Sequence, residues 1–83
     1  MSPVADQERT ERLAEQHRRE IVDAAERLVK GNGLHPLKLR DIAKESGKSL
    51  GNLYNYFQNK EAIIEALVER EKSRFLMVVS QKI

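Results

Sequence analysis

The sequence lacks cysteine and any long apolar run, and these two absences exclude several kinds of protein. Without cysteine, the chain cannot form disulfides, thiolate zinc sites or iron–sulfur clusters, which fits a reducing compartment. Its longest apolar run, residues 75–79, is far shorter than the roughly 20 residues that a helix needs to span a bilayer. Residues 1–4 hold no apolar signal-peptide core. These absences argue against a secreted or membrane protein, and we expect a cytoplasmic one.

The sequence also lacks the patterns that catalysis and metal binding require. Its two histidines, His17 and His35, are far apart and do not have the spacing of metal ligands. We expect His17 to pack on the apolar face of a helix and His35 to lie in a loop. Glycine-rich nucleotide-binding patterns are absent, because Gly31 and Gly33 are typical of a helix end. The sequence therefore predicts no enzyme, no metal site and no cofactor.

Helical periodicity is present along most of the chain, whose 83 residues allow one domain at most. Apolar residues recur at steps of three and four, which places them on one face of a helix. This pattern predicts helices over residues 7–30, 39–45, 50–57 and from about 60 past 75. On the first helix the apolar face includes Leu13 and Leu28. Residues 1–8 begin with Ser-Pro beyond Met1 and are expected to be a flexible N-terminus.

The second and third helices have the spacing of a helix-turn-helix, predicted over residues 38–57. Ala43 is small, as is needed where two helices cross closely, and Gly47 allows the positive φ of a tight turn. Leu53 is placed to fill the space beneath both helices. Ser49 is a good N-cap for the third helix, and Asn59 for the fourth. An ordinary helical hairpin shows similar spacing, so this pattern alone leaves both interpretations open.

The positive charge of the chain is concentrated in the same segment. Residues 38–60 carry five basic and two acidic side chains, a net charge of +3, although the whole chain has a net charge of only +2. Asparagine, glutamine and tyrosine side chains lie among these charges. Positive charge mixed with amide and phenol groups suits contact with DNA phosphates and base edges.

Residues 18–68 resemble the N-terminal DNA-binding domain of the tetracycline-repressor (TetR) family of transcriptional regulators. The matching text includes Arg40-Asp41-Ile42-Ala43-x-x-x-Gly47 and Gly51-x-Leu53-Tyr54-x-x-Phe57-x-x-Lys60-Glu61. The resemblance implies an all-α fold, with a homeodomain-like three-helix bundle that contains the helix-turn-helix and a fourth helix that leads to a further domain. It assigns residues 9–68 to the DNA-binding domain and residues 69–83 to the end of the fourth helix and the start of that further domain.

The resemblance also implies two groups of DNA contacts. The base-reading positions are Arg40, Leu50, Gly51, Asn52 and Asn55. The phosphate-binding positions are Lys38, Lys48, Ser49, Tyr54, Tyr56 and Lys60. Asparagine can bind adenine through two hydrogen bonds, which draws attention to Asn52 and Asn55. Lys48 stands where the family often has a buried valine, and we expect its side chain to extend outward toward DNA.

Members of this family carry a further helical domain that dimerises and binds a small-molecule effector. We therefore expect this chain to be part of a longer protein that acts as a homodimer on a palindromic double-stranded DNA operator. Its function would be that of a ligand-released repressor in the bacterial cytoplasm, associated with the nucleoid and not with a membrane. The alternative is a small helical interaction module that binds a partner protein, and not DNA, through Tyr54, Tyr56 and Phe57.

Overall fold

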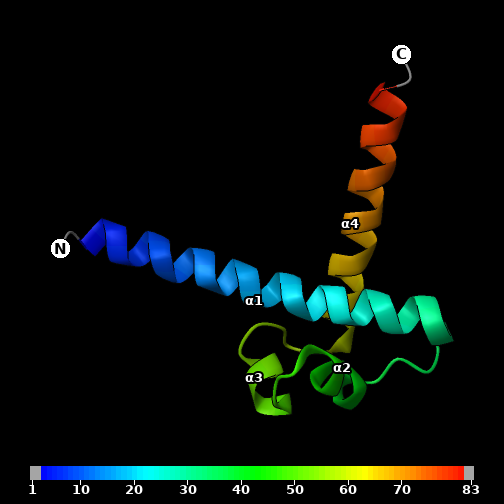
Figure 1. Ribbon diagram of the computed structural model, residues 1–83, viewed down its shortest axis with the longest axis horizontal. Helices are drawn as coiled ribbons and strands as arrows, with labels where there is room; N and C mark the ends of the chain where they lie inside the picture. Colours follow the sequence, from blue (N-terminus) through cyan, green and yellow to red (C-terminus); the bar gives the residue numbers. More distant parts are fainter. Residues whose placement is uncertain (1–2, 82–83) are drawn as a thin grey trace.

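The computed structural model describes the backbone of residues 3–81 and the side chains of residues 6–77. Within the described residues the fold consists of helices and contains no strand, which confirms the all-α expectation. The helices are α1 (Pro3–Asn32), α2 (Leu39–Ser46), α3 (Leu50–Tyr54) and α4 (Lys60–Gln81). Figure 1 shows α1 and α4 as two long helices that cross at a steep angle, with the short α2 and α3 below them.

Only the C-terminal half of α1 is packed against the rest of the chain. Ile21, Ala24 and Ala25 are fully buried there. Leu13, which periodicity placed on the same apolar face, is 50% exposed, because α2 and α3 do not extend beneath the N-terminal half (Figure 1). The backbone is helical from Pro3, earlier than the expected start near residue 7, whereas residues 1–2 lie outside the described residues.

Each of the four helices contributes one large aliphatic side chain to a common core. These four side chains, at most 1% exposed, are Ile21, Ile42, Leu53 and Ile63. Burying such a side chain stabilises the folded state by about 1.5–3 kcal/mol. Because every helix takes part, this small core fixes α2 and α3 against both long helices.

The connection between α2 and α3 has the geometry of a helix-turn-helix. Gly47 adopts a φ of 73°, and the backbone N–H of Lys48 reaches back to the Ala43 carbonyl oxygen at 2.9 Å. This arrangement satisfies a carbonyl at the end of α2 and turns the chain sharply. Both the small residue at 43 and the glycine at 47 have the roles that their spacing predicted.

The third helix is shorter than expected, since α3 ends at Tyr54 and not at Phe57. The backbone N–H groups of Tyr56 and Phe57 both bond to the Leu53 carbonyl oxygen, at 3.0 Å each. The chain therefore leaves the helix in a tight turn that brings it to the start of α4. Asn59 caps that helix, as predicted, by accepting a hydrogen bond from the Ala62 N–H at 2.9 Å.

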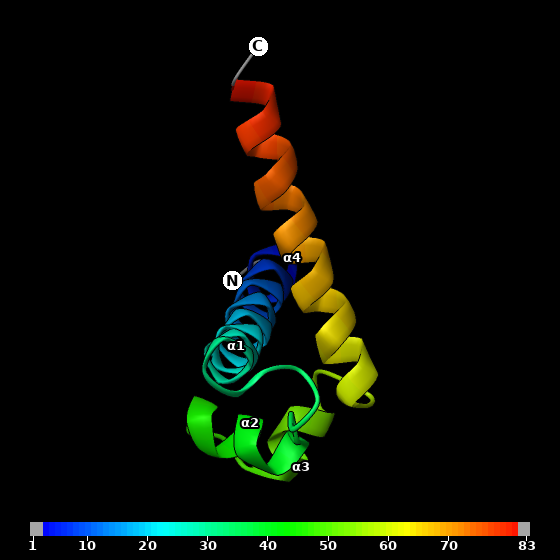
Figure 2. The same cartoon turned by 90° about the vertical axis from the view of Figure 1, so that its right-hand side faces the viewer.

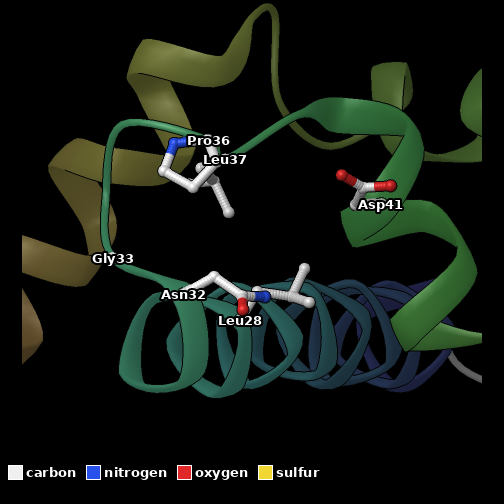
Figure 3. A pocket seen from close by; sticks show the side chains of 6 residues that line it. All are labelled: Leu28, Asn32, Gly33, Pro36, Leu37 and Asp41. Atoms are coloured by element: carbon white, nitrogen blue, oxygen red, sulfur yellow. The ribbon is translucent and has the colours of Figure 1, made fainter.

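The loop between α1 and α2 closes over the end of the core. Gly33 has a φ of 87° and ends the turn after α1, as a glycine does more readily than other residues. Leu37, 3% exposed, inserts into the core from this loop. Figure 3 shows a small pocket between α1, which contributes Leu28, and the loop and start of α2, which contributes Asp41. Its volume of about 20 Å³ is too small for an organic ligand.

Ion pairs hold α4 against α1 where the two helices cross. An Arg70 Nη1 atom lies 2.6 Å from Asp23 Oδ1, and an Arg74 Nη1 atom lies 2.7 Å from Glu26 Oε1. The Glu26 side chain is only 16% exposed. The hydrogen bond from Arg74 lowers the pKa of the Glu26 carboxyl below its usual value of 4.5, against the opposing effect of burial. The carboxylate form of Glu26 therefore stabilises the fold.

We predict that Glu26→Gln lowers the melting temperature at pH 7, because the guanidinium groups then face an uncharged amide. A carboxyl whose pKa is lower in the folded state stabilises that state above its unfolded pKa, and this stabilisation disappears as the pH falls through the folded pKa. The difference between the variant and the wild type should therefore shrink below pH 4.5 and vanish in stronger acid.

Thermal unfolding followed by circular dichroism over this pH range measures the difference. Glu69→Gln is the matched control, because Glu69 is 71% exposed and lies 3.8 Å from Lys72 on the same helix. Exposed pairs of this kind contribute little. An equal loss of melting temperature in both variants would contradict the prediction.

Candidate nucleic-acid interface

The helix-turn-helix lies at one end of the molecule, together with the beginning of α4. In Figure 1, α2 and α3 lie beneath α1, and in Figure 2 they lie beneath both long helices, at the opposite end from the C-terminus. Large parts of both short helices face outward here, since the core takes only Ile42, Ala43 and Leu53 as buried residues from them. Their exposed side chains form the candidate interface.

Local hydrogen bonds arrange the polar residues of α3. Ser49 has the extended backbone of an N-cap, and its Oγ accepts a hydrogen bond from the Asn52 N–H at 3.1 Å, as predicted. The Asn55 Nδ2 donates to Asn52 Oδ1 at 3.4 Å, so the two amides lie next to each other. Leu50 is 39% exposed and Tyr54 is 50% exposed. Together with Gly51, six of the predicted contact residues are thus brought together on one short helix and its two caps.

Gly51 lies on the exposed side of α3, and no part of the chain restricts its size. A Cβ atom built at this position meets no atom within 4 Å, and the backbone has no positive φ there. The fold itself therefore does not require glycine at residue 51. Its role as a base-reading position, which the family resemblance implies, stays a prediction.

Three predicted basic contacts lie around this helix. Lys38 and Arg40 are exposed at the beginning of α2, and Lys60 is half-buried at the beginning of α4. Lys38 is the N-cap residue of α2 and makes no side-chain cap, because its ammonium group cannot accept a hydrogen bond from a backbone N–H. Among the described side chains, none of these three residues takes part in an ion pair. Their charges are available to phosphates.

Lys48 does not extend outward, so the expected orientation of its side chain is wrong, whereas its contact with a phosphate stays a prediction. Its side chain is only 8% exposed. The ammonium Nζ donates to Glu20 Oε2 at 2.8 Å and lies 2.9 Å from His17 Nδ1. Because a buried ammonium needs polar partners, the lysine turns inward to α1, where an acidic side chain and an imidazole accept its hydrogen bonds.

Tyr56 also lies against α1. Its ring centroid is 5.4 Å from that of His17, and the Arg18 guanidinium carbon lies 5.9 Å from the centroid of the same ring. The side chain is half-buried and packs against the core. Its contact with a phosphate stays a prediction, as do those of Ser49 and Tyr54.

Sequence patterns did not indicate that Glu20 would be part of this region. It is separated from Lys48 by 28 positions, and its neighbours on α1 suggested a solvated charged face. The hydrogen bond from Lys48 lowers the pKa of the Glu20 carboxyl below its usual value of 4.5. One feature could have indicated a partner such as Glu20. Lys48 occupies a position typical of a buried apolar residue, and a lysine there requires a hydrogen-bond acceptor inside the fold.

The described residues contain no group of three or more histidine and acidic side chains that could hold a metal ion. Nor is any helix in that part of the chain long and apolar enough to cross a membrane.

Comparison with known proteins identifies the family. A sequence profile described as "Bacterial regulatory proteins, tetR family" matches residues 21–67, which is more than half of the chain. The fatty acid metabolism regulator protein of Bacillus subtilis is 37% identical over 57 residues, which cover 69% of this chain and 29% of that protein. The HTH-type transcriptional regulator UidR of Escherichia coli is 35% identical over 63 residues, which cover 76% of this chain and 32% of that protein.

A third relative, an uncharacterized HTH-type transcriptional regulator of Haemophilus influenzae, is 35% identical over 69 residues, 83% of this chain and 35% of its own length. The chain thus spans about a third of the length of the curated relatives that it matches. No solved structure gives a significant match. The family consists of regulators and not of enzymes, and the match covers α2, α3, the C-terminal part of α1 and the N-terminal part of α4. This chain belongs to the TetR family of bacterial regulatory proteins and holds the family's N-terminal DNA-binding domain.

Proposed function

We propose that this chain binds double-stranded DNA in a sequence-specific manner, with α3 in the major groove. The observation that carries the proposal is the outer side of α3, where the side-chain amides of Asn52 and Asn55 lie next to each other and Ser49 caps the helix through the Asn52 backbone N–H. Amide side chains can read adenine in the major groove through paired hydrogen bonds. A groove for a partner protein would present apolar side chains at these two positions, so the polar face favours DNA.

Phosphate contacts would come from the basic residues around α3. Lys38 and Arg40 are exposed at the start of α2, and Lys60 lies where the positive end of the α4 dipole adds to its charge. Such contacts position a protein on the duplex, whereas contacts with base edges supply the sequence preference.

The regulatory role that we propose is that of a repressor released by a small molecule. The whole protein would act as a homodimer on a palindromic operator, in the cytoplasm and on the bacterial nucleoid. In a helix-turn-helix dimer the two half-sites are about 34–36 Å apart, or a multiple of this distance. The names of the relatives support regulation of transcription, since UidR is named as a transcriptional regulator and the protein of Bacillus subtilis as a regulator of fatty acid metabolism. The effector would bind in a further domain.

We predict that Lys60→Ala weakens binding to all duplex sequences alike. Losing one phosphate contact should reduce the slope of log affinity against log salt concentration by about 0.9. Fluorescence anisotropy with labelled duplexes at several salt concentrations measures this slope. Lys72→Ala is the control, because Lys72 is 68% exposed on α4, away from α3. An unchanged slope in Lys60→Ala would remove this residue from the interface.

We predict that Asn52→Ala and Asn55→Ala relax the base preference at one or two positions in each half-site. Each lost pair of hydrogen bonds should cost about 1–3 kcal/mol of discrimination. Selection of binding sites from a random DNA pool, by each variant and by the wild type, reveals the change. If both variants select the wild-type motif, then Arg40 or the shape of the DNA supplies the specificity.

We predict that the 83 residues alone are monomeric or associate weakly at micromolar concentration. Phe75, Leu76 and Met77 are 62–68% exposed on α4 and offer a short apolar surface for a second copy. This area is small beside the roughly 800 Å² per partner of a stable interface. Sedimentation velocity measures the state. A stable dimer would show that α4 suffices for dimerisation.

A further inference from the structure

A polar cluster of His17, Glu20 and Lys48, which we name the α1 anchor, connects α1 to the turn before α3. Lys48 supplies one ammonium, 2.8 Å from a Glu20 carboxylate oxygen and 2.9 Å from the His17 ring nitrogen. Lys48 is 8% exposed, whereas Glu20 and His17 are 41% and 39% exposed. The lysine is therefore enclosed by the fold, and its two acceptors remain in contact with water.

This burial pattern implies that the α1 anchor affects the orientation of the neighbouring chain more than the stability of the fold. If Lys48 is replaced by an apolar side chain of similar length, Glu20 and His17 stay solvated and no buried charge is left without a partner. Replacing a buried ion pair by apolar packing is often neutral for stability. Such a replacement removes the two directional hydrogen bonds that set the position of the residue 48 side chain relative to Glu20 and His17. Apolar contacts do not set that position, because they have no preferred direction.

The α1 anchor contacts the chain on both sides of α3. On the N-terminal side, Lys48 directly precedes the cap residue Ser49, and its backbone N–H is bonded to Ala43 at the end of α2. On the C-terminal side, the Tyr56 ring lies against His17, with ring centroids 5.4 Å apart. The same histidine thus meets the residue before the α3 cap and a residue just after the helix. A helix of five residues with one buried side chain has few other constraints on its angle.

We propose that Lys48 is a positioning residue for DNA recognition, and that the α1 anchor sets the angle at which α3 meets the major groove. This inference rests on the proposed DNA binding and adds to it three residues that touch no DNA. The anchor acts on specific binding, which needs amides aligned with base edges. Non-specific binding depends on phosphate charges and tolerates a change of angle.

Lys48→Met, Glu20→Gln and the double variant test the proposal. Each single variant should bind the selected DNA sequence about tenfold more weakly, in the middle of the usual range for coupled residues. The double variant should bind no more weakly than either single one, because both changes remove the same constraint. Affinity for unrelated duplex DNA should stay within about twofold, and melting temperatures within about 4 °C of the wild type.

The change in DNA affinity caused by Glu20→Gln shows whether Lys48 positions α3 or contacts DNA directly, because the two roles predict changes of opposite sign. Removing a negative charge from a DNA-binding protein strengthens binding through general electrostatics, and it would also free Lys48 if that lysine bound a phosphate. Positioning predicts the opposite, which is weaker binding to the selected sequence. Lys72→Met is the control for losing an exposed positive charge far from α3.

Anisotropy titrations with selected and unrelated duplexes, together with thermal unfolding, give all of these values. A wild-type chain that binds its selected DNA, with Lys48→Met and Glu20→Gln binding it equally well, overturns the positioning role and leaves the proposed function intact. Stronger binding by Glu20→Gln, or an equal loss on both duplexes in Lys48→Met, also overturns it in favour of a direct contact. A wild type that prefers no DNA sequence overturns the proposed function and this inference with it.

Discussion

Burial of Leu53 is the interaction on which the rest of the candidate interface depends. A five-residue helix is far too short to be stable by itself in water, since isolated helices shorter than about 12–15 residues are marginal. Leu53 is the only buried residue of α3, at 1% exposure, and it meets Ile21, Ile42 and Ile63 from the other three helices. The outward side chains of α3 are therefore held by a helix that exists because of packing on its inner side.

Local chemistry made most of the fold predictable from the sequence. Gly47 and the caps at Ser49 and Asn59 depend on interactions within a few residues, and each has its expected role. The predictions were wrong where contacts between distant parts of the chain determine the structure. Leu13 is exposed because no other helix extends beneath it, and α3 ends at Tyr54 because the chain must turn into α4. Periodicity describes one helix and does not show how far its neighbours reach.

The exposure of several candidate contact residues could be predicted from the sequence, whereas the inward orientation of Lys48 could not. Exposure of Lys38, Arg40 and Asn55 follows from their positions opposite the core. For Lys48, the position of a buried valine in the family was known, but the acceptors that keep a lysine there lie on α1. Two residues that are 28 positions apart produce no periodic pattern in a single sequence. Burial of a charge can be foreseen only together with its partner.

The space around Gly51 has a consequence for how such regulators diverge. A Cβ atom added there meets no described atom within 4 Å outside its own helix backbone and chain neighbours, and Asn52 and Asn55 are likewise absent from the core. Mutation at these positions changes the outer surface of α3 and leaves Leu53 and its contacts untouched. If α3 reads DNA as proposed, duplicated copies of such a gene can change their DNA preference by single substitutions without passing through unfolded intermediates. Evolution of the recognition surface is in this sense separated from evolution of the fold.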